Sequence, residues 1–209
     1  MPSGAFGAAD FNVFDVKGFQ PRMTQIRERI RPRLEALGHR LAPAIQRTTG
    51  DEIFVHVARH VRRTVNPPDD TWVAFAADRR GYKKHCHFKV AVSRRCVRFL
   101  FEVGPEHGDK KRWAAAWKKS APNIGAVLRR VKGLAWFKNE HDETPASALG
   151  DLTPEDLAAL ADEIIRTRDG QLVLGRVVAA DEAARWSEAQ YRSAALETFR
   201  ALAPLYRLR

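Results

Sequence analysis

Apolar residues recur at helical spacing in the first quarter of the chain. The positions are Met23, Ile26, Ile30, Leu34, Leu37, Leu41 and Ile45, each three or four residues after the last. This spacing predicts an amphipathic helix, because residues three and four apart share one helix face. Pro32 and Pro43 fall inside the pattern. Each removes a backbone donor, so the sequence predicts a kink or two abutting helices.

The apolar pattern then changes to a period of two. It runs through IFVHVA (53–58), TWVAFA (71–76), CHFKVAVS (86–93) and CVRFLFEV (96–103), which predict strands of an antiparallel sheet. A turn at Arg94 and Arg95 would pair Ser93 with Cys96 and place apolar side chains on one face of the hairpin. The other face would carry His85, His87, Lys89, Arg98 and Glu102, with His87 opposite Glu102.

Further helices and strands are predicted in the second half. Residues 109–131 indicate a helix with Trp113 and Trp117 beside exposed lysines, 135–137 a short strand or docking loop, and 140–151 a polar connector. Capping signals at Thr153 and Ser187 begin two more helices, the first reaching about Arg168, and QLVLGRVV (171–178) between them predicts a strand. We therefore expect one α+β domain over residues 11–209, with a central, mostly antiparallel sheet and helices packed on one face. The Gly/Ala-rich residues 1–10 predict a disordered tail.

Composition excludes several classes of protein. The 209 residues are 44% hydrophobic and 29% charged, which is typical of a globular domain. Neither a targeting segment nor an apolar run long enough to span a membrane is found, so a cytoplasmic location is expected. Cys86 and Cys96 would lie about 23 Å apart on the predicted hairpin. That distance is too long for a disulfide and fits a reducing compartment.

The net charge of +11 is unevenly distributed. Residues 59–98 contain 11 basic and 3 acidic side chains, whereas residues 151–209 contain 8 basic and 10 acidic ones. Such a local excess of positive charge favours a polyanionic or phosphorylated partner. Three interpretations remain open at this point: a solvated basic surface, a nucleic-acid interface and a site for a small anionic ligand.

Two stretches supply the candidate anion-binding residues. Arg62 and Arg63 precede the stiff turn Asn66-Pro67-Pro68-Asp69-Asp70, which would hold their guanidinium groups in place for phosphate or carboxylate oxygens. Residues 78–85 then combine cations with an aromatic ring. There, Arg80, Lys83 and Lys84 would contact phosphates and Tyr82 would stack on a base. A rigid loop and an exposed basic loop are the structural alternatives.

Candidate catalytic residues are fewer. His85, His87 and Glu102 would share one strand face and could supply acid–base chemistry. They could also form a metal site, but the pattern favours hydrogen-bonded structural or surface histidines, and neither a metal nor a cofactor is expected. His56 and His60 would lie about 13 Å apart on a strand, too far for one ion. Phosphate-binding glycine loops and a nucleophile elbow are absent from the sequence, and Cys86 has no evident catalytic partner.

Several of these stretches resemble the YktB-like family of uncharacterised bacterial proteins. The similarity is carried by EIFVHVARHVRRTVNPPDDTWVAF followed by RGYKKHCHF, by RERIRPRLEALG, by QLVLGR and by ETFRALAPLYRL, and it extends from about Asp10 to Leu208. The resemblance implies one compact α+β domain of cytoplasmic type, without an established activity, cofactor or catalytic residue. Cys86 departs from the family pattern, where proline is commoner, and residues 109–120 match it poorly.

Three functions follow as hypotheses. The first is a non-enzymatic module that binds an anionic partner, most simply nucleic acid, through Arg62, Arg63, Arg80, Lys83 and Lys84, with Tyr82 stacking. The second is an enzyme acting on a small phosphorylated or carboxylated molecule, which requires a concave pocket where His85, His87 and Glu102 converge with the arginines. The third is an interaction protein, which would expose the tryptophans of residues 109–119.

Overall fold

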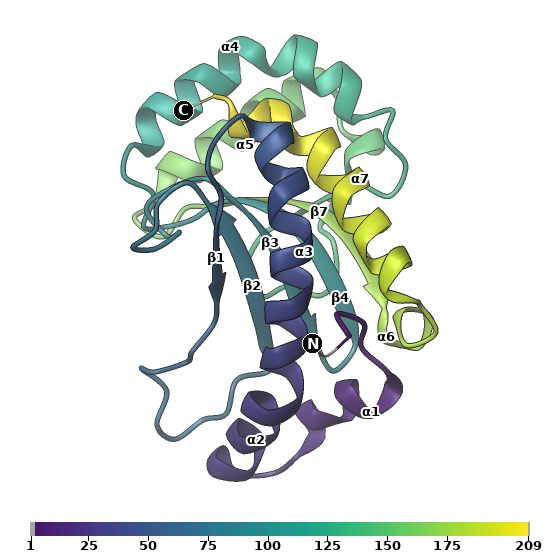
Figure 1. The fold of residues 1–209 in the computed structure, drawn as a ribbon. Coiled ribbons are helices and arrows are strands. Elements are labelled where there is room, and N and C mark those ends of the chain that lie inside the picture. The colour runs from purple at the N-terminus through teal and green to yellow at the C-terminus, as the bar shows by residue number, and fades with distance from the viewer. Residues whose placement is uncertain (1–2, 209) are drawn as a thin grey trace.

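One antiparallel sheet of seven strands organises the computed structural model, which describes residues 3–208 (Figure 1). Its strands lie in the order β1-β2-β3-β4-β7-β5-β6. The strands are β1 Phe54–Val57, β2 Asp70–Ala76, β3 His87–Ser93, β4 Cys96–Val103, β5 Ala135–Phe137, β6 Ser147–Ala148 and β7 Leu172–Ala179. The last long strand, β7, is inserted between β4 and β5, so β1 and β6 form the two edges.

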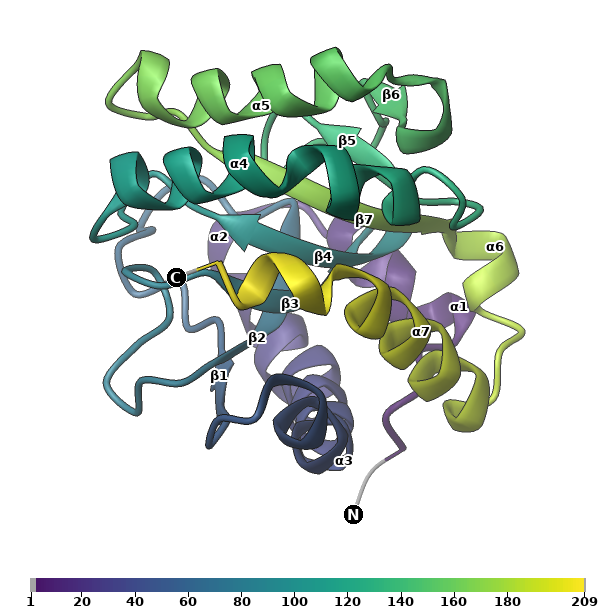
Figure 2. The same ribbon diagram turned by 90° about the horizontal axis from the view of Figure 1, so that it is seen from above.

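Helices pack against one face of the sheet. The α-helices are α1 Ala8–Phe11, α2 Phe19–Gln25, α3 Arg31–Thr49, α4 Lys110–Leu128, α5 Pro154–Arg166, α6 Ala180–Ala183 and α7 Glu188–Tyr206. Short helices of other types cover Asn12–Asp15, Ile26–Ile30 and Leu149–Asp151. Figure 2 shows α3 and α7 together on one side of β1–β4, and α4 and α5 stacked beside β7. The expected α+β domain is thus confirmed.

The predicted hairpin forms with the predicted register. In the β3–β4 pair, Val90 lies opposite Phe99 and His87 opposite Glu102. The apolar face of this hairpin faces α7, where the rings of Phe88 and Tyr206 stack with their centroids 5.4 Å apart. Apolar alternation and a two-residue turn were sufficient to predict this register, because a shift by one residue would turn every apolar side chain out of the core.

The two prolines of the first helical pattern have different effects. Pro32 lies at the start of α3, directly after the π-helical turn Ile26–Ile30, so the predicted interruption occurs there. Pro43, in contrast, lies inside α3, which continues to Thr49. Leu41 and Ile45 are both fully buried on either side of Pro43. Their burial against the core offsets the backbone hydrogen bond that proline removes.

The beginning of the chain differs from the expected disordered tail. Residues 1–2 lie outside the described part, but Phe6 is only 1% exposed and α1 begins at Ala8. The hydroxyl of Tyr191 donates to the carbonyl of Phe6, and buried Asp10 forms ion pairs with Arg29 and Arg33. The Gly/Ala-rich composition concealed this anchor, because the segment contains a single aromatic residue, Phe6, which packs into the core.

The tryptophans of α4 are buried as well. Trp113 and Trp117 are 1% and 0% exposed, and the indole N–H of Trp117 donates to the carbonyl of Leu157 over 2.7 Å. The exposed aromatic patch that an interaction helix would require is therefore not present on α4. Within the described residues, none of the helices combines the length and apolar character needed to cross a bilayer.

Candidate functional site

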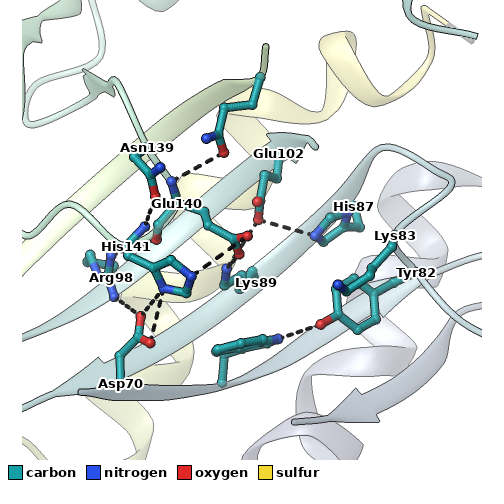
Figure 3. Close-up of polar contacts among 12 residues, drawn as sticks. Asp70, Tyr82, Lys83, His87, Lys89, Arg98, Glu102, Asn139, Glu140 and His141 are labelled. Carbon is teal, nitrogen blue, oxygen red and sulfur yellow. Dashed lines mark hydrogen bonds and ion pairs between the residues drawn. The ribbon is translucent and has the colours of Figure 1, made fainter. Parts of the chain in front are cut away.

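The sheet face opposite α3 and α7 carries a buried charged cluster. We call it the polar face and define it by His87 and Lys89 on β3 and by Arg98 and Glu102 on β4. All four side chains are at most 3% exposed, although sequence alternation placed them on the outer side of the hairpin. Figure 3 shows the segment that contains Asn139, Glu140 and His141 lying across the strands beside Lys89, Arg98 and Glu102, and Tyr82 lying next to His87. We call residues 138–145 the covering segment.

Lys89 lies at the centre of the polar face. Its ammonium contacts the carboxylate of Glu102 at 3.3 Å and also bonds the carboxylate of Glu140 from the covering segment. The same ammonium lies 4.5 Å from the ring centre of Trp72, a cation–π distance. Burial lowers the pKa of Lys89, but the two carboxylates outweigh burial and raise it overall. Lys89 is therefore a charged, fully paired group rather than a neutral nucleophile.

His87 and Glu102 meet as the sequence predicted, and His85 does not join them. His87 Nε2 lies 3.2 Å from Glu102 Oε2, while its Nδ1 lies 3.0 Å from the carbonyl oxygen of His85. A carbonyl can only accept, so His87 Nδ1 carries a proton. Burial raises the pKa of Glu102, but Lys89 and His87 outweigh it and hold this pKa well below its usual range. The ring of His85 instead contacts Asp78, at 3.2 Å.

Arg98 joins the polar face both to β2 and to the covering segment. Arg98 bonds the carboxylate of Asp70 on β2, and its other terminal nitrogen donates to the carbonyls of Glu140 and Asp142 at 2.7 and 2.9 Å. Both carboxylate oxygens of Asp70 lie 3.1 Å from Nδ1 of His141. The guanidinium therefore positions both the carboxylate and the segment that carries the histidine. Sequence reasoning missed Asp70, Glu140 and His141 as part of this cluster.

The sequence contained one indication of the missing partners. The polar face carries two strand cations, Lys89 and Arg98, but a single strand carboxylate, Glu102. A buried cation requires a partner, so at least one acid had to come from elsewhere in the chain. Nothing in the local pattern identifies which one, because residues 140–151 have no regular periodicity.

The His141–Asp70 contact predicts a pH dependence of stability. The bond to Asp70 raises the pKa of His141, and burial opposes it. A raised pKa means that the folded state binds the proton more tightly than the unfolded chain does. The contact therefore stabilises the folded protein fully at pH values below about 6.5, the pKa of histidine in the unfolded chain. This stabilisation is lost as the pH rises through the higher pKa that His141 has in the folded protein. The facing charges are Asp70, Glu140 and Lys89.

We expect His141→Gln to be more destabilising at about pH 6 than at about pH 8. Urea unfolding midpoints of the wild type and the variant at both pH values measure the difference. His39→Gln, at an exposed position on α3, controls for the general effect of losing a histidine. If the urea midpoints of the wild type and His141→Gln differ by the same amount at both pH values, the proposed role of the His141–Asp70 contact is contradicted.

A large concavity opens beside the edge strand β1. Its volume is about 1090 Å³, and we call it the basic groove. Five cations line it, together with two acids, two aromatic residues and three histidines; they are Arg59, Arg79, Arg80, Lys83, Lys84, Asp78, Glu106, Phe54, Tyr82, His39, His56 and His85. Four of the six predicted anion-binding residues, Arg80, Tyr82, Lys83 and Lys84, are among them.

The cations of the basic groove are neutralised unequally. Arg80 pairs with Asp78 at 3.5 Å and Lys83 pairs with Glu106 at 2.8 Å. Within residues 3–208, Arg59, Arg79 and Lys84 form no ion pair. The groove therefore keeps an excess of positive charge that its own acids do not cancel.

The two predicted arginines of the 58–69 connection lie outside this lining. Both are exposed, and Arg63 lines a smaller concavity of about 520 Å³ that also contains Asp70 and His141. Glu106 lines the groove, and its pKa is lowered chiefly by Lys83 and then by the charge of Arg62. The charge of Arg62 therefore acts on the groove. Of the predicted pair, Arg63 therefore lines the smaller concavity, and neither arginine lines the basic groove.

Tyr82 connects the basic groove to the polar face. Its hydroxyl accepts the indole N–H of Trp72 at 2.8 Å, and its ring lies edge-on to His87 with centroids 4.8 Å apart. Figure 3 shows the ring lying next to His87. Burial raises the pKa of the Tyr82 hydroxyl, so it stays protonated at neutral pH. The ring is held in one orientation, and its role in stacking stays a prediction.

Comparisons with known proteins show that the chain is similar to one protein family. A family sequence model described as "Domain of unknown function (DUF1054)" matches residues 6–206. A UPF0637 protein of Macrococcus caseolyticus is 36% identical over 201 residues, which cover 96% of this chain and 97% of the relative. UPF0637 proteins of Bacillus licheniformis and Bacillus cereus (strain ATCC 14579) are 35% and 31% identical over 208 residues, and the alignments cover 97% and 99% of those relatives. The names of these relatives assign no activity.

Proposed function

Since the chain belongs to the DUF1054 family, an uncharacterised bacterial family, we propose its function from the geometry of the site: it is a non-enzymatic module that binds nucleic acid in the basic groove. The expected YktB-like membership is confirmed, and it leaves the activity open. The residues that would contact phosphate are Arg80, Lys83 and Lys84, as the sequence suggested, joined by Arg59 and Arg79.

The unpaired cations of the groove carry this proposal. Arg59, Arg79 and Lys84 are exposed and line one concavity, and none of them has an acidic partner among residues 3–208. Unpaired cations that share a surface attract phosphates, and their binding releases the counterions that surround a nucleic acid. Arg62 adds charge near the rim, and Arg63 would extend the footprint toward the smaller concavity.

An enzyme acting on a small phosphorylated or carboxylated molecule is the second candidate. The 3.2 Å contact between His87 and Glu102 favours it, because an acid–base pair is assembled. Yet both side chains are at most 3% exposed, so a substrate would reach them only after a local rearrangement of the residues around them. His85, the third catalytic candidate, lines the basic groove and contacts Asp78 there. The open groove thus supports binding better than catalysis.

The test is a paired neutralisation of groove cations. We expect Arg79→Ala with Lys84→Ala to weaken binding of a labelled single-stranded oligonucleotide. The plot of log affinity against log salt should also become shallower by about 1.4, because each phosphate that a cation no longer neutralises reduces the slope by about 0.7. Fluorescence anisotropy over a salt series measures both quantities.

A matched variant removes the same charge elsewhere. Arg192→Ala with Arg200→Ala changes two exposed arginines of α7, on the helical side of the sheet. We expect this control to keep the wild-type slope. If both double variants behave alike, or if the wild type binds no oligonucleotide at low salt, the proposed function is wrong.

A further inference from the structure

The basic groove follows the open edge of the sheet. Five consecutive residues, Ile53 to Val57, line it, and they include the whole of β1. β1 pairs with β2 alone and is the first strand of the sheet order. Opposite β1, the groove is bounded by the loop of residues 78–85. His56 fixes the two sides relative to each other, since its Nε2 lies 3.0 Å from the carbonyl oxygen of Asp78.

The backbone of β1 presents polar groups to this groove. The N–H of Ala58, one residue beyond β1, donates to the carbonyl of Trp72 at 2.9 Å. In an antiparallel pair, residues whose backbone groups bond the neighbouring strand alternate with residues whose backbone groups point away from it. Phe54 and His56 therefore direct their backbone groups to β2, whereas Val55 and Val57 direct theirs to the open edge. Unpaired N–H groups at a sheet edge are donors for an extended ligand.

The side chain of Phe54 gives the groove an accessible aromatic surface. Phe54 and His56 lie opposite Ala76 and Ala74 in the β1–β2 register, so they share one face of β1. Phe54 is half-buried and lines the groove. Tyr82, the other lining aromatic, is held by its bond to Trp72. Phe54 is therefore the better placed aromatic ring for stacking, although the sequence suggested Tyr82.

These features distinguish between forms of nucleic acid. A duplex keeps its base faces stacked inside and is usually read by a helix or β-ribbon that projects into the major groove. Here the cations and the aromatic ring line a hollow instead. A single strand exposes base faces, and proteins bind it by combining a basic groove with aromatic stacking platforms. The recessed ring and the surrounding cations match the second case.

We propose that the basic groove is a site for single-stranded nucleic acid in which an unstacked base packs on Phe54 and the neighbouring phosphates contact Arg59, Arg79 and Lys84. This inference rests on the proposed function and specifies the form of the ligand. The open edge of β1 supplies backbone donors along the path of the strand. The stacking is sequence-tolerant, because every base has an aromatic face.

The experiment compares Phe54→Leu with the wild type on a labelled oligo-uridine and on a duplex of equal length. Leucine keeps an apolar side chain at position 54 but removes the aromatic face. We expect Phe54→Leu to bind the oligo-uridine about 5- to 100-fold more weakly with an unchanged salt slope, because the variant cannot stack on a base but keeps every cation that neutralises phosphate. We expect the wild type to prefer the single strand over the duplex.

Phe19→Leu, at a half-buried aromatic residue of α2, is the matched control and should bind like the wild type. Equal urea midpoints of the two variants would show that both are folded. If Phe54→Leu binds like the wild type, or if the duplex binds at least as tightly, this inference is overturned while the proposed function stands, provided that the Arg79 and Lys84 variant still weakens binding. If the wild type binds neither probe, both fail.

Discussion

Replacing Arg98 with methionine is expected to lower the free energy of unfolding by about 3–5 kcal/mol. The guanidinium is fully buried and bonds the carboxylate of Asp70, which is itself 6% exposed. Methionine fills part of the volume but leaves that carboxylate with His141 as its remaining partner. It also removes the donors to the carbonyls of Glu140 and Asp142. Removing one member of a buried ion pair is destabilising mainly because the other charge stays behind.

Urea unfolding measures the loss of stability in Arg98→Met, and hydrogen exchange locates it. We expect faster exchange across the covering segment, because Arg98 holds two of its carbonyls. Arg94→Met, at a half-exposed arginine in the same hairpin, is the control and should change stability by about 1 kcal/mol or less. The double variant Arg98→Met with Asp70→Asn should lose less than the sum of the single losses. A loss in Arg98→Met no larger than that in Arg94→Met would refute the assigned role.

Lys89→Met is expected to be similarly destabilising, by about 3–5 kcal/mol. Lys89 is fully buried and neutralises Glu102 and Glu140 at once. Without the ammonium, Glu102 keeps only the His87 contact, in a site where its side chain is 2% exposed. Its carboxylate would then be easier to protonate, since burial penalises the charged form.

The pH dependence separates this explanation from simple loss of packing. In the wild type, Glu102 has a lowered pKa. Its contribution to stability is therefore present above the pKa that it has in the unfolded chain, and is lost as the pH falls through its pKa in the folded protein. In Lys89→Met, acid would relieve the uncompensated charge. We therefore expect the stability gap between wild type and variant to narrow as the pH falls from about 7 to about 4.5. Adding Glu102→Gln to Lys89→Met should bring the stability at pH 7 closer to that of the wild type. If neither the lower pH nor the second substitution reduces the difference in stability, the uncompensated charge of Glu102 is not its cause.

Local patterns predicted the elements and the hairpin well. Turn and alternation signals determined the β3–β4 register, and the capping boxes at Thr153 and Ser187 were found where predicted. These features depend on residues close in sequence, so a single chain contains the information. The position of β7 between β4 and β5 is a non-local property, and periodicity alone could not reveal it.

The candidate site was predicted in parts. The cations of residues 78–85 were recognised from their charge, and they line one groove. Phe54 was missed because its exposure depends on β1 being an edge strand, which only the sheet order shows. His141 was missed because its partner, Asp70, lies 71 residues earlier in the chain. Contacts at such separations leave no local pattern.

The position of the covering segment in the chain also affects how the protein folds while the ribosome is still synthesising it. β2, β3 and β4 leave the ribosome before Glu140 exists, and β5, which precedes the covering segment, pairs with the later strand β7. Until β7 is made, one face of the nascent hairpin therefore presents Lys89 and Arg98 to water, while its apolar face still lacks α7. Charged side chains directed outward discourage unwanted pairing between unfinished sheets. The ions that the mature fold buries would thus protect this one face of the growing sheet until the covering segment reaches it.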